Sequence, residues 1–470
     1  MATLIKNGTL VTAEESFSAD ILVEGEVIAQ VGKDLQIEAT EVVDASDRLI
    51  LPGGVDPHVH LDLPMFGTVS SDDHYTGTKA AAFGGTTTVI DFVPFESPSL
   101  DESVEKWRRK AEKAAVDYAA HMNLTRFNAN IAAEIPSLRE KGITTLKVFT
   151  AYNGRLRIDD SSILQAMNIA RETGMLVMLH AEDGDEIERL TADALAAGHS
   201  TPIWHARTRP ASGAVAVAER IFALAASVDA ELYLVHMTSA GEVDLLAAGR
   251  RRGLKVMGET CPQYLFFSED DLCRPEAAKW ICSPPVRTAT DNARLWEGLG
   301  DGTIQTIGTD HCPFFYDGTR SILYEGKPVA IPGKELGAGD FTRIPNGLPG
   351  VEDRLPVLWT SGVGSERMTA SKFVALTSTN PAKIFGLYPR KGALLTGSDA
   401  DIVIWDPGKK VTCGVALSHQ RTDFNLYEGW DLTGMPEKVF LRGQCIVDGG
   451  NWLGKAGKGQ FLPRQPGEII

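Results

Sequence analysis

The feature that most constrains this chain is a pair of histidines two positions apart, His58 and His60, within residues 51–62, LPGGVDPHVHLD. The preceding residues form an apolar, glycine-punctuated run of the kind found in buried strands. On a strand, positions i and i+2 point to the same face, so both imidazoles can reach one point. Neutral imidazole is the commonest side-chain ligand of zinc-like ions. Such a pair can also stand by chance on a surface strand, so a metal site requires further ligands elsewhere in the chain.

Residues 51–390 alternate short apolar runs with helical periodicity, which is typical of βα units around a parallel sheet. Besides the strand of His58, predicted strands lie at residues 86–90, 119–122, 145–149, 176–180, 232–236, 254–257 and 304–308, and helices at 101–117, 161–173, 214–227 and 291–299. This makes about eight strands, as a TIM barrel requires. We therefore predict an α/β fold with a (β/α)8 TIM-like barrel over residues 51–390.

The two ends of the chain are both rich in short strand-like runs separated by glycine-containing turns. Neither end alone offers enough strands for an independent core. We predict that residues 1–50 and residues 391–470 pair with each other to form one small β-sandwich domain.

Further candidate ligands end the predicted barrel strands, where barrel enzymes carry their chemistry. His180 and His236 each close an apolar run, and Asp310 ends the last strand. One strand-end histidine would more often be structural, but two of them beside a His-X-His pair favour a shared metal site. Asp310 could bind a metal and move a proton, and the alternative of a helix N-cap is weakened by Pro313. Strand alternation should turn His311 away from the centre.

Lys147 is unusual because it lies inside an otherwise apolar predicted strand, TLKVF, at residues 145–149. Burying an ammonium costs several kcal/mol unless it is paired or neutralised. Lys147 could point outwards between helices or pair with a carboxylate. Alternatively, its amine could add CO2 and become an anionic carbamate, whose two oxygens could bridge two metals ~3.5–4 Å apart.

Composition excludes several classes of partner. The net charge of −16 argues against nucleic acid or an anionic membrane surface. No apolar run approaches the ~20 residues of a membrane helix, and the first residues lack the features of a signal peptide. The six cysteines show no CxxC pair or dense framework, which suits a reduced, cytoplasmic protein. Cys312, close to Asp310, is interpreted as a packing residue.

Taken together, these residues resemble the cyclic amidohydrolases, and within them the dihydropyrimidinase and D-hydantoinase branch. The matching motifs span nearly the whole chain: residues 54–62 (GVDPHVHLD), 70–73 (SSDD), Lys147 with Ala151 and Tyr152, 180–182 (HAE), 282–287 (CSPPVR), 309–314 (TDHCPF), 340–347 (DFTRIPNG), 351–354 (VEDR), 377–383 (TSTNPAK) and 397–401 (GSDAD). This combination is highly specific, although a lone His-X-His would not be.

The resemblance implies a hydrolase that opens the cyclic amide bond of 5,6-dihydropyrimidines and 5-substituted hydantoins, which are small cyclic ureides, to N-carbamoyl amino acids. It implies two divalent ions, expected to be zinc, bridged by carbamylated Lys147. One ion would be held by His58, His60, Lys147 and Asp310, and the other by Lys147, His180 and His236. It also implies a homotetramer.

The resemblance also implies roles for the residues around the ring. A hydroxide between the ions would attack the ring amide while Tyr152 donates a hydrogen bond to the oxyanion. Asp310 would carry the proton to the leaving nitrogen. Backbone groups of Ser283 and Asn346 would bind the N–H and C=O edge of the ring.

Two segments depart from the family pattern. The connection over residues 315–339 looks longer than usual, and could form a lid or change the substrate range. Arg155 and Arg157 follow Tyr152 where family members often carry apolar or aromatic residues. These arginines could simply be solvated, or one of them could favour polar or acidic ring substituents.

Three related functions compete with this interpretation. Dihydroorotases typically place an arginine two residues after the second histidine to bind a substrate carboxylate, but this chain has Asp62 there. Allantoinase stays open. A non-catalytic scaffold, as in the collapsin response mediator proteins, has lost metal ligands, whereas every proposed ligand is present in this chain.

Overall fold

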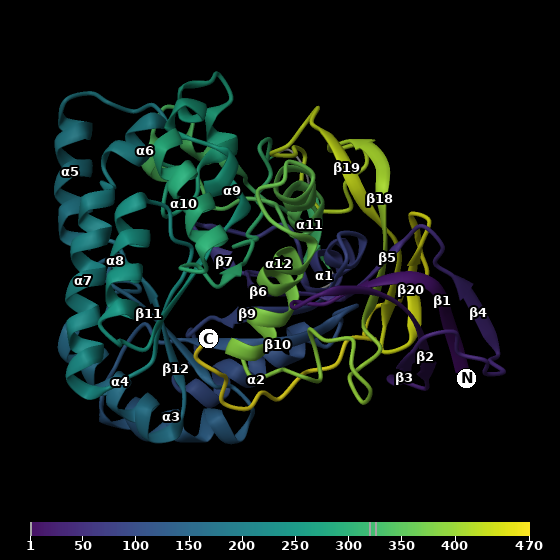
Figure 1. The fold of residues 1–470 in the computed structure, drawn as a ribbon. Helices are drawn as coiled ribbons and strands as arrows, with labels where there is room; N and C mark the ends of the chain where they lie inside the picture. The colour runs from purple at the N-terminus through teal and green to yellow at the C-terminus, as the bar shows by residue number, and fades with distance from the viewer. Residues whose placement is uncertain (1, 319–320, 325–326) are drawn as a thin grey trace.

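The computed structural model describes residues 2–318, 321–324 and 327–470. Its centre is a sheet of eight parallel strands that wraps into a barrel (Figure 1). In sheet order these are β6 (Gly54–Val59), β9 (Thr86–Val93), β10 (Asp117–Asn123), β11 (Thr145–Phe149), β12 (Leu176–His180), β13 (Leu232–Leu234), β14 (Val256–Thr260) and β15 (Thr306–Ile307). Their residues are buried throughout, as expected of parallel strands covered on both faces. The predicted TIM-like barrel is confirmed.

The barrel closes between its first strand and the residues just beyond its last. The backbone amide of Asp310 donates to the carbonyl of His58 over 2.9 Å, and the amide of His60 donates to the carbonyl of His311 over 2.8 Å. Val59 and His311 are parallel bridge partners. Three of the residues whose backbone joins the two ends of the sheet, His58, His60 and Asp310, are therefore predicted metal ligands.

Helices surround the barrel (Figure 1). The longer ones are α1 (His74–Phe83), α2 (Leu100–Ala111), α3 (Ala129–Glu140), α4 (Asp160–Thr173), α5 (Gly184–Ala196), α7 (Ala211–Val228), α8 (Ala240–Arg251) and α10 (Ala289–Asp301). The short α-helices are α6 (Ile203–Arg207), α9 (Pro262–Phe266), α11 (Arg354–Leu358), α12 (Ala370–Val374) and α13 (Asn380–Ile384). Single 3-10 turns are η1 (Glu269–Cys273), η2 (Ala277–Trp280), η3 (Lys334–Gly337) and η4 (Phe341–Arg343), and η5 (Trp359–Val363) and η6 (Ala375–Thr379) are π-helical.

The helix predicted over residues 101–117 is too long. Helix α2 ends at Ala111, and Asp117 already begins β10. Asp117 is completely buried, and its carboxylate pairs with Lys391 at 2.6 Å and with Arg442. Both cations come from the far end of the chain, so the local periodicity, which predicts a strand at residues 119–122, gives no sign that the strand begins at Asp117.

The two ends of the chain form a second, mostly antiparallel sheet of nine strands. They are β1 (Ala2–Val11), β2 (Ser16–Glu24), β3 (Val27–Gly32), β4 (Glu41–Asp44) and β5 (Leu49–Pro52), with β18 (Ile402–Thr412), β19 (Asp431–Leu441), β20 (Gln444–Asp448) and β21 (Asn451–Trp452). Strands β5 and β18 pair with Ile50 opposite Ile404, so the purple and yellow ends lie together in Figure 1. A shared apolar core includes Ile5, Ile21 and Phe440. The predicted pairing of the ends is confirmed, while the boundaries at residues 50 and 391 stay predictions.

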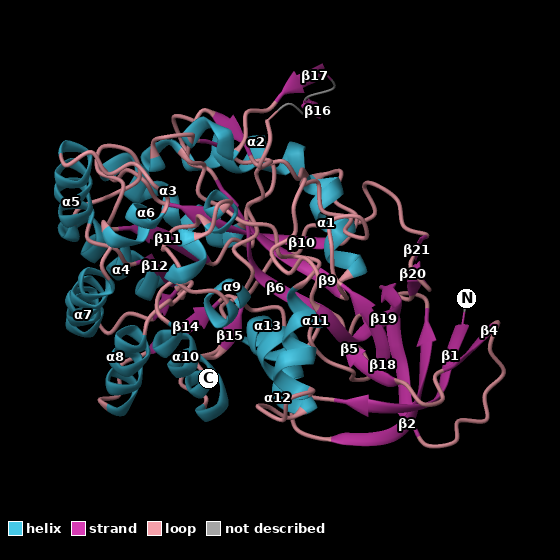
Figure 2. Cartoon of the chain, turned by 90° about the horizontal axis from the view of Figure 1, so that it is seen from above, coloured by secondary structure: helices cyan, strands magenta, loops and turns pink. Residues whose placement is uncertain are grey.

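Two small hairpins lie outside both sheets. One joins β7 (Pro64–Met65) to β8 (Thr68–Val69), and the other joins β16 (Ser321–Tyr324) to β17 (Lys327–Ala330). The second projects from the body of the molecule at the top of Figure 2. It belongs to the connection predicted over residues 315–339, of which residues 319–320 and 325–326 lie outside the described residues. The hydroxyl of Thr68 donates to the carbonyl of Pro332 over 2.6 Å, so the first hairpin contacts the segment that follows β17. A lid role for the connection stays a prediction.

One helical stretch, Ile203–Val228, is long and apolar enough to cross a membrane by length and composition alone. It comprises α6 and α7, and α7 packs against α4 and α8. The buried side of α7 includes Val217, Ile221 and Phe222, while Glu219 and Arg220 are exposed. This is the pattern of an amphipathic helix on the outside of a barrel.

Arg354 holds the closing strands together from beneath. Its side chain is completely buried and donates to the carbonyls of Val55 and Ile307 over 3.0 and 2.9 Å, and to the hydroxyl of Thr86 over 3.0 Å. It also lies 4.0 Å from the buried carboxylate of Asp56. One guanidinium thus contacts β6, β9 and β15.

Replacing this arginine should destabilise the fold. We expect Arg354→Met to lower the free energy of unfolding by about 3–5 kcal/mol, because it leaves the buried Asp56 carboxylate without its cation. Urea unfolding followed by fluorescence and circular dichroism measures the change. The matched control is Arg343→Met at an exposed position, for which we expect a change within about 0.5 kcal/mol. Equal unfolding midpoints for the two variants would contradict the prediction.

Candidate active site

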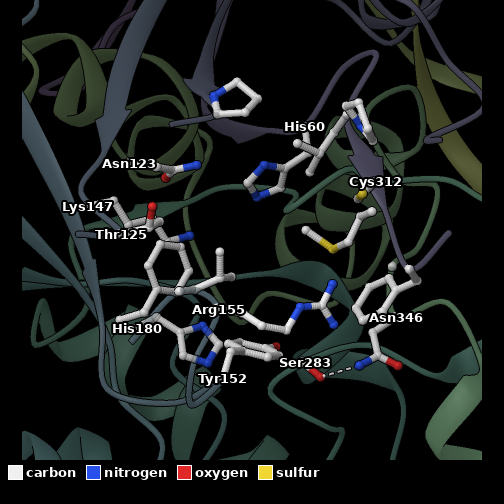
Figure 3. A pocket seen from close by; sticks show the side chains of 18 of the residues that line it. His60, Asn123, Thr125, Lys147, Tyr152, Arg155, His180, Ser283, Cys312 and Asn346 are labelled. Carbon is white, nitrogen blue, oxygen red and sulfur yellow. Dashed lines mark hydrogen bonds between the residues drawn. The ribbon is translucent and has the colours of Figure 1, made fainter. Parts of the chain in front are cut away.

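A cavity of about 230 Å³ opens at the carboxyl ends of the barrel strands (Figure 3). Five of the six predicted metal ligands line it: His60, Lys147, His180, His236 and Asp310. The sixth, His58, lies beneath them and is fully buried. The three residues predicted to bind substrate, Tyr152, Ser283 and Asn346, line the same cavity. The structure therefore brings all the predicted site residues to one place.

Asp310 joins the two histidines of the His-X-His pair. Its Oδ1 atom lies 3.1 Å from Nε2 of His58 and 3.1 Å from Nε2 of His60. Both imidazoles therefore point to the same side of the strand, as the alternation predicts. Burial by itself would raise the pKa of Asp310, but the adjacent His58 and His60 hold this pKa well below its usual range. Asp310 is therefore an ionised carboxylate at neutral pH.

Lys147 points into the barrel towards these residues. Its Nζ atom lies 3.1 Å from Nε2 of His58 and 4.2 Å from the centre of the Phe92 ring. The alternative in which Lys147 points outwards between helices is therefore wrong. Burial lowers the pKa of this amine to about 8, with Asp310 acting in the opposite direction. At neutral pH a much larger fraction of this amine is therefore uncharged than for an exposed lysine.

His180 and His236 complete the cluster from β12 and from the residues that follow β13. Nδ1 of His180 lies 3.0 Å from Nε2 of His236. Burial lowers the pKa of His60 and His180, and it places the pKa of His236 well below the ordinary value. These imidazoles are therefore neutral at pH 7, which is the form that binds metal.

Two buried carboxylates behind the histidines were assigned no role from the sequence. Oε1 of Glu259 lies 2.7 Å from Nδ1 of His58, and Oε2 of Glu182 lies 2.8 Å from Nε2 of His180. Arg209 donates to the same Oε2 of Glu182 over 2.9 Å. A carboxylate on one ring nitrogen fixes the tautomer and directs the other nitrogen to the metal. The sequence pattern could have revealed Glu259, because this residue is an acid inside the apolar strand β14, just as Lys147 is a base inside the apolar strand β11.

Close packing holds the Glu259 and His58 pair in place. A Cβ atom at Gly308 would lie 2.7 Å from Oε2 of Glu259 and 2.9 Å from Cβ of His58. Any larger residue there would displace one of the two. The glycine of the GTD sequence therefore gives the last strand room to approach the first.

Three site residues have left-handed backbone conformations that non-glycine residues rarely adopt. The φ angles are +65° at Tyr152, +38° at His236 and +53° at Asp310. Such conformations cost of order 1–3 kcal/mol each and cluster at functional sites. They turn these side chains from the strand ends into the cavity.

Tyr152 and the two predicted ring-binding residues lie on the opposite side of the cavity from His60 (Figure 3). Burial raises the pKa of Tyr152 to about 12, so its hydroxyl is protonated and can donate at neutral pH. The side-chain amide of Asn346 donates to Oγ of Ser283 over 3.0 Å. Each of these residues can therefore present a polar group to a small ligand.

A buried lysine supports the segments that carry Ser283 and Asn346. Nζ of Lys334 donates to the carbonyls of Ile281 and Pro345 over 3.1 and 2.9 Å. The amide of Gly347 donates to the carbonyl of Ile281 over 3.1 Å. Lys334 lies within the predicted long connection, so part of that connection fixes the floor of the cavity. The sequence reasoning missed this residue.

His311 lies outside the cluster, as strand alternation predicts, and so do the other five histidines. His311 contacts Asp72 at 3.2 Å and accepts from the amide of Gly350. The others contact protein groups elsewhere: His74 with Asp91, His121 with Pro57, His199 with Trp204, His205 with Cys282 and His419 with Glu352.

The cluster has the composition of a metal site. One donor atom from each of His58, His236 and Asp310 lies within 4.8 Å of the other two. Nδ1 of His60 and Nδ1 of His236 are buried and have no hydrogen-bond partner among the described residues. The Nε2 atoms of the same two rings point into the cluster, towards Asp310 and His180 respectively. The neutral imidazoles of His60, His180 and His236 beside the ionised Asp310 suit a divalent cation.

Comparison with known proteins identifies close relatives along the whole chain. The amidohydrolase family matches residues 49–446. The D-hydantoinase of Geobacillus stearothermophilus is 42% identical over 469 residues, covering 99% of this chain and 97% of that protein. The D-hydantoinase of Rhizobium radiobacter is 41% identical and covers 99% of both chains. The crystal structure of dihydropyrimidinase from Brevibacillus agri NCHU1002 superposes with a TM-score of 0.95 at 42% identity and covers 100% of both chains.

The carboxylate behind His58 should control metal affinity. Glu259→Gln removes the charge that orients the imidazole, so we expect metal affinity to fall about 10- to 100-fold. Metal content after dialysis against buffered metal, measured by mass spectrometry, gives the affinity. Glu297→Gln changes an exposed glutamate and serves as the matched control. The same metal affinity in both variants would contradict the role of Glu259.

Proposed function

The chain belongs to the amidohydrolase family, in its D-hydantoinase and dihydropyrimidinase branch, and we propose that it opens the cyclic amide bond of 5,6-dihydropyrimidines and 5-substituted hydantoins to give N-carbamoyl amino acids. Cyclic amide hydrolysis is the activity of this branch. The observation that carries the proposal is the convergence of four histidines, Lys147, Asp310 and Tyr152 on one cavity. Relatives covering the whole chain support it independently.

We propose that the cluster holds two divalent ions, which we expect to be zinc. His58, His60, Lys147 and Asp310 would hold one ion, and Lys147, His180 and His236 the other. When bound, such ions would lower the pKa of a nearby water towards neutrality and polarise the carbonyl of the scissile amide.

Lys147 can serve both ions only as a carbamate. Its neutral amine adds to the carbon of CO2 and loses a proton to water, which converts the amine into an anion with two oxygens. The lowered pKa of the amine and the His58 nitrogen 3.1 Å away favour this change. Burial disfavours an ammonium ion at position 147. A carbamate at the same position could instead act as a metal ligand.

Tyr152 and Asp310 have complementary tasks during ring opening. As water adds to the amide carbon, the carbonyl oxygen becomes negative, and the protonated hydroxyl of Tyr152 can donate to it. The ionised carboxylate of Asp310 accepts the proton of the attacking water. It then gives this proton to the ring nitrogen as the C–N bond breaks.

Ser283 and Asn346 are proposed to hold the ring through their backbone groups. An amide edge with one N–H and one C=O needs one acceptor and one donor at fixed positions. Lys334 binds the carbonyl two residues before Ser283 and the carbonyl next to Asn346, so these two segments are held relative to each other. This fixed spacing supports recognition of a planar cyclic ureide.

The assembly and the location are proposed from the family and the composition. We propose a homotetramer, which analytical ultracentrifugation would test. We propose a cytoplasmic location, which suits the six free cysteines.

A ring-opening assay tests the proposed function. We expect hydrolysis of dihydrouracil, hydantoin and 5-substituted hydantoins, with most activity lost on prolonged chelation and recovered on adding a divalent metal. Absorbance at the amide band and chromatography of the N-carbamoyl products measure the rates. A preference for allantoin would favour an allantoinase, and a metal-free, inert protein would favour a non-catalytic scaffold.

Replacing the bridging lysine tests the carbamate. We expect Lys147→Ala to lower kcat by roughly 10³-fold, equivalent to about 4 kcal/mol of transition-state stabilisation. Propionate should restore part of the activity, because its two oxygens can replace those of the carbamate. The exposed Lys255→Ala variant is the control and should keep full activity. Full activity in Lys147→Ala would contradict the proposal.

A further inference from the structure

The two arginines that follow Tyr152 have different surroundings. Nη1 of Arg157 lies 2.6 Å from the carboxylate of Asp185 and 2.9 Å from the side-chain oxygen of Asn153. Arg157 is therefore held outside the cavity by a local ion pair. Arg155, by contrast, lines the cavity together with Tyr152. The structure thus separates two residues that the sequence leaves equivalent.

A tight turn directs Arg155 to this position. The carbonyl of Tyr152 accepts hydrogen bonds from the amides of Arg155 and Leu156 over 3.0 Å each, and from the amide of Arg157 over 3.3 Å. The turn requires the left-handed backbone of Tyr152 and of Gly154, whose φ is +69°. The position of Arg155 is therefore coupled to that of Tyr152, the proposed hydrogen-bond donor to the reacting carbonyl.

The guanidinium of Arg155 reaches into the open part of the cavity. Figure 3 shows its side chain pointing into the space that His60, Tyr152 and Asn346 border. Among the lining residues that the structure describes, Lys147 and Arg155 are the two cationic side chains. Lys147 is buried at the base of the cavity beside His58. Arg155 is exposed and stands at the mouth.

The other side chains at the mouth leave this charge uncompensated. Met65 and Phe66 are apolar. Glu96 also lines the cavity, but its carboxylate lies 3.3 Å from Nζ of Lys106. The ionised Asp310 is engaged with His58 and His60 on the floor. A cation that pairs with neither of these carboxylates favours a substrate group that carries the opposite charge.

We propose that Arg155 forms a subsite for a carboxylate carried by the ring substituent, so that the enzyme favours cyclic ureides with an acidic side chain. This inference rests on the proposed function, because the ring must first be bound and opened at the floor. The planar guanidinium fork matches a carboxylate through two parallel hydrogen bonds. The product of such a substrate is an N-carbamoyl amino acid with an acidic side chain.

A pair of nearly isosteric substrates isolates the effect of charge. We would measure kcat/KM for 5-(carboxymethyl)hydantoin and 5-(carbamoylmethyl)hydantoin, which differ by a carboxylate against a carboxamide, and for the corresponding pair with one more methylene. The ratio of acid to amide within one variant cancels any general loss of activity. The variants are Arg155→Gln, which removes the charge, Arg155→Lys, which keeps it, and Arg157→Gln as the matched control. Unsubstituted hydantoin serves as the reference substrate.

We expect Arg155→Gln to lower the acid-to-amide ratio roughly five- to tenfold for at least one substituent length, as for a partly exposed ion pair. Most of the loss should lie in KM. Arg155→Lys should keep part of the ratio, and Arg157→Gln should keep all of it. In the unmodified enzyme the ratio should fall as salt rises from low ionic strength, because salt screens an exposed pair.

Other outcomes overturn the inference in distinguishable ways. An unchanged ratio in Arg155→Gln, with hydantoin still opened by the unmodified enzyme, would overturn the subsite alone. An equal fall in Arg157→Gln would show a general electrostatic effect and would also overturn it. If the metal-loaded, unmodified enzyme opens none of these rings, the proposed function fails and the subsite with it.

Discussion

The contact between the first barrel strand and the residues after the last one supports both the fold and the site. The amide of Asp310 binds the carbonyl of His58, while the Asp310 carboxylate contacts the imidazoles of His58 and His60. Backbone closure and ligand convergence are therefore produced by the same few residues. A shift in strand register would turn every side chain to the other face, so it would open the barrel and disperse the site together.

The polar side chains buried at the site need hydrogen-bonding partners on the side away from the cavity. Glu259 binds His58, Glu182 binds His180, and Arg209 neutralises Glu182. A buried polar network of this kind is stable only when most of its members are satisfied. Nδ1 of His60, Nδ1 of His236 and Oε1 of Glu182 have no hydrogen-bond partner among the described residues. The Nε2 atoms of His58 and His60 converge on Asp310, which is where a cation would bind.

The cavity combines a fixed floor with a more variable rim. The floor is held by strand ends and by Lys334, which binds the two segments that carry Ser283 and Asn346. The rim is formed by loops, including the turn that carries Arg155. Rigid elements suit the invariant chemistry of opening an amide, and loops suit the choice of ring substituent.

Local patterns in the sequence determined the class of fold and most of the site. Apolar runs ending in His180 and His236, the His-X-His pair and the out-of-place Lys147 each carry a signal within a few residues, because strand alternation and burial cost act locally. The tertiary structure alone decided where β10 begins, since Asp117 is paired with Lys391 and Arg442 from the far end of the chain. It alone also separated Arg155 from Arg157, because the partner of Arg157 is Asp185, 28 residues away. Contacts between distant segments have no local signature, so residues such as Lys334 become recognisable only when the chain is folded.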